Sequence, residues 1–341
     1  MPKIIFIILL GSLSQLAQAG LSLRKGDRIL LYGNSFIERL QTHGLFEASL
    51  QLAHPEKNLE CRSLAWTGDE VGYRLRPERY VNHLKNLLSK WPANVVILGF
   101  GINESFAGPE GISRFRSDLD GYIDEMQRRH PGAPIIVLSP IATEDLKHPH
   151  YPDTVKRNAG IRAYVDAMRE VTSRQEVRFV DLFAPSLAAY ANQKIPLTSN
   201  GIHLNDAGYG VMANHLAQAL LGPEVYAQVD QERAAVVARA VARKAEYVAS
   251  VVRPVNTVLY FGVRGRAHEY NAEIPRYHEL IARSDARIHA MLQDASIQFD
   301  PNPLTLSPLV KRDPAELPSP DEMLKSFRVA DGYEVNLFAS E

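Results

Sequence analysis

Short apolar runs alternate with amphipathic stretches between residues 28 and 221, and this alternation limits the possible folds more than any other feature. The apolar runs predict strands at 28–32, 59–64, 94–98, 134–138 and 177–181. Three of them are almost wholly apolar, which is typical of parallel strands covered on both faces. The stretches between them repeat apolar residues with helical spacing, at about 36–53, 80–88, 112–129, 154–172 and 206–221. We therefore predict an α/β fold, a three-layer α/β/α sandwich with a five-stranded parallel sheet.

The first nineteen residues have the pattern of a secretory signal peptide. Lys3 supplies a positive charge, residues 4–10 form an apolar run, and Ala-Gln-Ala at 17–19 is a small-x-small cleavage motif. A membrane-spanning helix needs about 20 apolar residues, and polar residues from Ser12 onward interrupt this run. We therefore expect an exported protein, periplasmic or extracellular, with no integral membrane span after signal cleavage.

The pattern changes after Gly222. Residues 224–250 are rich in alanine and valine and predict one long helix, and 274–293 predict another. Prolines concentrated between 301 and 320 indicate a linker. We divide the chain into a signal peptide, an α/β domain, a helical extension, a linker and the start of a further module, with bounds 1–19, 20–222, 223–296, 297–323 and 324–341.

Several classes of function are disfavoured by composition. The formal net charge is -1, so no overall field attracts nucleic acid. The stretch 99–104 begins like a dinucleotide-binding loop, but Glu104 replaces its third glycine and would repel a pyrophosphate. His148 and His150 lack a suitably spaced acidic or cysteine partner for a metal, and no Cys-x-x-Cys-His motif for covalent haem occurs. We expect neither a cofactor nor a metal.

Four polar or glycine positions follow predicted strands or precede the last helix of the α/β region. They are Ser35, Gly68, Asn103 and His203. Active sites of parallel sheets lie at the carboxyl ends of the strands, so these residues are candidates for a nucleophile, two oxyanion donors and a general base. Taken singly, each also fits an ordinary role: a helix cap for the serine, a turn for the glycine and asparagine, a loop position for the histidine.

Taken together and in order, these four positions resemble the sequence blocks of the SGNH (GDSL-like) hydrolase family over residues 28–221. The resemblance implies a flavodoxin-like sheet with Ser35 as nucleophile and His203 as base. It also implies an oxyanion hole formed by the N–H groups of Ser35 and Gly68 and the side chain of Asn103. No Gly-x-Ser-x-Gly motif of the ordinary α/β-hydrolase fold is present.

The chain departs from the family where the third member of a catalytic triad is expected. Three residues before His203 the family carries an aspartate, and this chain carries Asn200. An asparagine lacks the charge that stabilises an imidazolium, and an Asp→Asn change in a serine protease costs about 10⁴ in turnover. We favour a Ser–His dyad with a backbone carbonyl orienting the ring. Asp181 and Asp206 are alternative acids from other loops.

The C-terminal part resembles segments of large secreted bacterial proteins. The 224–296 region is similar to their helical extension, and 324–341, hairpin-like around Asp331-Gly332, is similar to the opening of a sorbosone-dehydrogenase-like β-propeller. The expected function is a secreted serine esterase acting on a small-molecule or glycan ester, such as a carbohydrate O-acetyl ester. The alternative is a catalytically idle module that binds glycan or docks a larger oxidoreductase-like protein.

Overall fold

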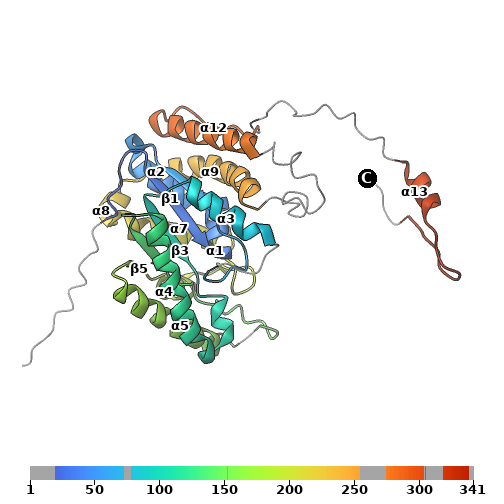
Figure 1. Cartoon of the computed structure of the whole chain (residues 1–341), viewed down its shortest axis with the longest axis horizontal. Coiled ribbons are helices and arrows are strands. Elements are labelled where there is room, and N and C mark those ends of the chain that lie inside the picture. Colours follow the sequence, from blue (N-terminus) through green and yellow to red (C-terminus); the bar gives the residue numbers. More distant parts are fainter. Residues whose placement is uncertain are drawn as a thin grey trace, which may run out of the picture. The chain divides into compact units, whose positions relative to one another are not determined.

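The five predicted apolar runs form one parallel sheet in the order β2-β1-β3-β4-β5 in the computed structural model of the chain (Figure 1). The register pairs Gly33 with Gly99 and Leu31 with Ser63, so β1, β2 and β3 end at one edge of the sheet. This confirms the predicted α/β fold with five parallel strands. The strands are β1 (Arg28–Gly33), β2 (Glu60–Ser63), β3 (Val95–Gly99), β4 (Ile135–Leu138) and β5 (Arg178–Val180).

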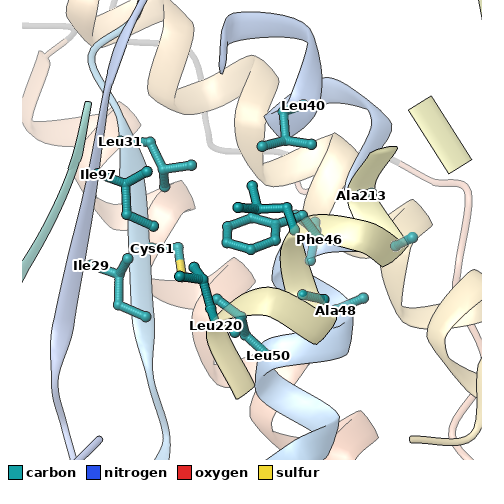
Figure 2. Packing of buried hydrophobic residues seen from close by; sticks show 14 of the residues in the cluster. Ile29, Leu31, Leu40, Phe46, Ala48, Leu50, Cys61, Ile97, Ala213 and Leu220 are labelled. Atoms are coloured by element: carbon teal, nitrogen blue, oxygen red, sulfur yellow. The ribbon is translucent and has the colours of Figure 1, made fainter. Parts of the chain in front are cut away.

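Alternate strand residues point to opposite faces of the sheet, and helices cover both. Ile29, Leu31 and Ile97 pack on one face with residues of three helices, including Leu40, Phe46 and Leu220 (Figure 2). The helices on this face are α1 (Ser35–His43), α2 (Leu45–Ala53) and α7 (Asp206–Leu221).

The other face is covered by a second layer of helices. Leu30, Tyr32 and Leu98 pack there against a separate cluster of buried side chains. The helices of this layer are α3 (Glu78–Lys90), α4 (Ile112–Arg129) and α5 (Thr154–Arg174). Shorter elements connect the layers: the 3₁₀ turns η1 (Pro55–Lys57), η2 (Glu104–Ala107) and η3 (Pro109–Gly111), and the helix α6 (Phe183–Asn192).

The helix predicted over 36–53 is two helices, because the chain turns at Gly44. Gly44 has φ +78°, a left-handed conformation that favours glycine. A Cβ there would also meet the carbonyl oxygen of Ala238 at 2.2 Å. The apolar spacing continues through the turn, so periodicity alone did not reveal it.

The helix predicted over 224–250 is also divided. A short helix, α8 (Pro223–Tyr226), is followed by α9 (Gln231–Val252), whose N-cap is Asp230. Val237 and Val241 of α9 belong to the same buried cluster as the sheet. The second predicted helix is present as α12 (Ile274–Gln293), which packs on α9 (Figure 1). The helical extension therefore shares its core with the α/β domain.

The structure describes residues 20–72, 78–151, 153–253, 274–302, 304 and 318–337. The predicted signal peptide and most of the predicted linker lie outside these ranges. The chain forms two units, residues 1–304 and 305–341. The described part of the second unit holds α13 (Pro320–Ser326), a turn at 331–332 and no strand. Within the described ranges, no helix is long and apolar enough to span a bilayer.

Candidate active site

A cavity opens at the carboxyl ends of the central strands. It brings together three of the sequence-predicted site residues, Ser35, Asn103 and His203. Its walls also carry the apolar side chains of Phe36 and Ile202. The remaining lining residues are Asn34, Gly99, Phe100, Ile102, Ser139, Pro140, Ile141, Leu204 and Tyr209.

Ser35 is the first residue of α1, directly after the strand β1. Gly33 allows β1 to lie close to both β3 and α1, since a Cβ there would meet the carbonyl oxygen of Gly99 at 2.2 Å and the side chain of Ile37 at 2.8 Å. The cap of α1 is Asn34, whose Oδ1 accepts from the N–H of Phe36 at 3.1 Å. Capping therefore does not occupy Ser35. Among the described residues its hydroxyl has no hydrogen-bond partner, and the side chain is half-buried at the cavity.

The predicted oxyanion donors are partly assembled. The side-chain nitrogen of Asn103 donates to the carbonyl oxygen of Asp69 at 2.8 Å, which ties the loop after β2 to the loop after β3. An amide nitrogen carries two N–H groups, so one remains for a second acceptor. Gly68 has φ +79° and precedes Asp69, but it is not among the residues that line the cavity. The structure thus brings Asn103 to Ser35 and leaves Gly68 one residue from the contact.

Glu104 holds the loop that carries Asn103, a role that the sequence did not reveal. Its carboxyl oxygens accept from the N–H groups of Val71 and Gly101, both at 2.8 Å. Burial raises the pKa of Glu104 to about 7, although these two N–H groups oppose the rise. Glu104, which does not fit the pattern of a dinucleotide-binding loop, therefore links two loops of the site through these hydrogen bonds.

His203 lies in a loop that is folded back on itself. Thr198 and Leu204 form an antiparallel bridge, and the N–H of Ser199 donates to the carbonyl oxygen of His203 at 2.9 Å. Buried Glu144, from the loop after β4, accepts from the N–H of Thr198 at 2.7 Å and from its hydroxyl at 2.5 Å. Glu144 is far from this loop in sequence, and no local pattern pointed to it.

The side chain of Asn200 contacts the ring nitrogen of His203 that faces away from a reacting serine. Its Nδ2 lies 3.1 Å and its Oδ1 3.3 Å from Nδ1 of His203. The same Oδ1 accepts from the N–H groups of Ile202 and His203, at 3.2 and 2.9 Å. Asn200 thus stands where the family has an aspartate, and within the described residues no backbone carbonyl bonds to Nδ1.

Neither alternative acid contacts His203 in the described part of the chain. A carboxylate oxygen of Asp181 accepts from the N–H of Phe183 at 2.8 Å, and the other pairs with Arg169 at 2.5 Å. Asp206 begins α7 and lies beside His43. Burial, and secondly the positive charge of Arg39, hold the pKa of His203 below its ordinary value. The ring is therefore neutral at neutral pH, as a general base must be.

Ser35 and His203 share the cavity without a direct hydrogen bond between their side chains. Catalytic hydrogen bonds are often long before substrate binds, so this geometry is compatible with proton transfer between them. Among the described residues, no group of three or more histidine, cysteine, aspartate or glutamate side chains is arranged to hold a metal ion.

The sequence of residues 31–211 matches the GDSL-like Lipase/Acylhydrolase family. No curated protein matches the chain. Among solved structures, a gut microbial diltiazem-metabolizing enzyme is 19% identical with a TM-score of 0.46, and the match covers 60% of this chain and 49% of that one. The chain therefore spans about half the length of that enzyme.

Two further solved structures are similar over most of their own length. An alpha/beta hydrolase from the metagenome of Lake Arreo is 18% identical with a TM-score of 0.47, covering 59% of this chain and 98% of that one. An acetylxylan esterase from Geobacillus stearothermophilus is 14% identical with a TM-score of 0.46, covering 59% and 96%. Similarity at this level does not identify a substrate.

Proposed function

The chain belongs to the GDSL-like lipase/acylhydrolase family and is a serine hydrolase of esterase or acylhydrolase type, and we propose that it cleaves carboxylic esters through an acyl-enzyme at Ser35. One observation carries this proposal. Asn34, and not Ser35, caps the helix α1, so the hydroxyl of Ser35 is not used as a cap. Ser35 also lines the same cavity as His203 and Asn103. A free hydroxyl, a neutral imidazole and an amide donor are the groups that acyl transfer requires.

The proposed reaction has two steps. Ser35 Oγ attacks the ester carbonyl carbon while Nε2 of His203 takes the hydroxyl proton, and the tetrahedral oxyanion is stabilised by the Ser35 N–H and the Asn103 amide. The intermediate collapses, the alcohol leaves with the proton from His203, and the acyl group stays on Ser35. Water then attacks the acyl carbon while His203 takes its proton, and as the second intermediate collapses the carboxylic acid leaves and His203 returns the proton to Ser35 Oγ. The N–H of Gly68 is the third donor that the family resemblance implies.

We infer a carbohydrate O-acetyl ester as the substrate class. The cavity combines polar groups with Phe36 and Ile202, which suits a small acyl group on a larger polar alcohol. The signal-peptide pattern of residues 1–19 supports export, where such glycan esters occur. Residues 324–341 would then open a further module of a longer secreted protein.

A fluorophosphonate probe tests the nucleophile directly, because it reacts only with an activated serine. We expect covalent labelling that maps to the peptide containing Ser35 and is abolished in Ser35→Ala. Ser250→Ala, which removes a half-buried hydroxyl of α9 that does not line the cavity, serves as the control and should label like the wild type. An unlabelled wild type would favour the alternative function, a catalytically idle module that binds glycan or docks a partner.

The pH profile of ester hydrolysis tests the base. His203 accepts a proton only when neutral, and burial together with Arg39 lowers its pKa from 6.5. Activity should therefore be lost as the pH falls through a value below 6.5 and be retained above it. The measurement is kcat/KM on p-nitrophenyl acetate between about pH 4 and 8, with the midpoint of the acid limb read from the curve. A midpoint above 7 would mean that another group is the base.

A further inference from the structure

Arg39 lies on the same face of α1 as the proposed nucleophile. It is four residues after Ser35, and residues four apart in a helix are neighbours on its surface. The residue as a whole is half-buried. Arg39 is not among the residues that line the cavity, but it lies one helical turn beyond Ser35, and its positive charge lowers the pKa of His203, which does line it.

This guanidinium has no carboxylate partner among the described residues. The adjacent acid, Glu38, is already engaged: one of its oxygens pairs with Arg253 at 2.5 Å, and the other accepts from the N–H and hydroxyl of Thr67 at 2.5 and 2.6 Å. Another acid near the cavity, Glu104, is bound to two backbone N–H groups of its own loops. A guanidinium without a counterion is available to pair with an anionic ligand.

The position of Arg39 also indicates which part of an ester it would meet. In the proposed reaction His203 gives its proton to the leaving alcohol, so the alcohol part lies on the His203 side of the scissile bond. Arg39 is close enough to His203 for its positive charge to lower the pKa of that ring. A guanidinium binds a carboxylate through two parallel hydrogen bonds, which fixes both distance and orientation.

We propose that Arg39 is a specificity-determining residue that binds a carboxylate on the alcohol part of the ester. The substrate class is then an acyl ester of a hydroxy acid, such as an O-acylated uronic acid within a glycan. This inference rests on the proposed esterase function and narrows it from any acyl ester to anionic ones.

Two acetate esters that differ in one charge test the proposal: 3-acetoxybenzoate, which is anionic, and its methyl ester, which is neutral. The ratio of their kcat/KM values is measured for each variant, so that the intrinsic reactivity of the two phenols cancels. A charge-assisted hydrogen bond contributes about 1.5–3 kcal/mol, so Arg39→Gln should lower the ratio by about ten- to a hundredfold. Arg39→Lys, which keeps the charge and loses the paired geometry, should retain part of the preference.

Arg114→Gln is the matched control, since it removes the same charge from an exposed position on α4 and should leave the ratio unchanged. Raising the ionic strength should weaken the preference of the wild type and not that of Arg39→Gln. If the wild type hydrolyses both esters and Arg39→Gln keeps the same ratio, the role of Arg39 is wrong and the esterase function stands. If neither ester nor p-nitrophenyl acetate is hydrolysed, the esterase function itself fails, and the role of Arg39 fails with it.

Discussion

Asn200→Asp is expected to raise ester turnover, by at least about tenfold and by as much as about 10⁴-fold, the factor lost in the reverse change in a serine protease. The reason is the tautomer of His203. To take a proton from Ser35, Nε2 must be unprotonated, so the single proton of the neutral ring must sit on Nδ1. An aspartate at position 200 would accept a hydrogen bond from Nδ1–H and stabilise the imidazolium that forms.

The wild-type amide favours the other tautomer. The N–H groups of Ile202 and His203 both donate to one atom of the Asn200 side chain, so that atom must be the oxygen and cannot be exchanged with the nitrogen. The nitrogen lies 3.1 Å from Nδ1 of His203, nearer than the oxygen at 3.3 Å, and this shorter contact favours donation from the amide to the ring. A bond of this kind requires an unprotonated Nδ1 and places the proton on Nε2. We expect the wild type to react slowly, through its minor tautomer.

The measurement is kcat on p-nitrophenyl acetate for the wild type and Asn200→Asp, together with the ring-nitrogen NMR shifts of His203. Protonated Nδ1 should be the minor form in the wild type and the major form in the variant. Ser199→Asp adds the same charge to the same loop without reaching Nδ1, and it should not reproduce the gain. Equal turnover in the wild type and Asn200→Asp, with unchanged tautomers, would show that the amide does not control the proton.

The sheet could be predicted from the sequence because its strands are buried on both faces, which requires uninterrupted apolar runs such as 94–98. The turn at Gly44 was not predicted, because the apolar spacing of the two helices continues across it without interruption. The contact between Asn200 and His203 was accessible because the two residues are three apart. Which atom of the Asn200 amide faces His203 is decided by the two backbone N–H groups that donate to Asn200 Oδ1, and the direction of these N–H groups cannot be predicted from the sequence.

Side chains that join distant segments were the least accessible to sequence reasoning. Glu144 and Thr198 meet only because two loops fold onto one edge of the sheet. Lys244 lies in a helix with many charged residues, and the helical pattern is compatible with a solvated position. It is in fact 1% exposed, because α12 covers it from one side and α2 from another.

Lys244→Met is expected to lower the free energy of unfolding by about 3–5 kcal/mol, the cost of removing one partner from a buried ion pair. Lys244 bonds to Glu47 of α2, which is 1% exposed, and to Asp285 of α12 at 3.0 Å. Burial alone would lower the pKa of Lys244, but Asp285 and Glu47 outweigh burial and raise it, so the lysine stays charged. Methionine has a similar length and removes the charge together with the N–H donors.

The loss of unfolding free energy should be large because the buried network contains equal numbers of positive and negative groups, and the substitution leaves one carboxylate without a partner. Asp285 also pairs with Arg62 of β2 at 2.5 Å, so two bases and two acids meet where the sheet edge, α2, α9 and α12 pack together. Without Lys244 two buried carboxylates would share one arginine.

Urea denaturation of the wild type, Lys244→Met and the surface control Lys194→Met measures the difference, and the control should change by less than about 0.5 kcal/mol. Adding Glu47→Gln to Lys244→Met removes the unpaired acid and should restore part of the loss. A loss below about 1 kcal/mol in Lys244→Met would show that water reaches the cluster and that these charges do not hold α9 and α12 to the sheet.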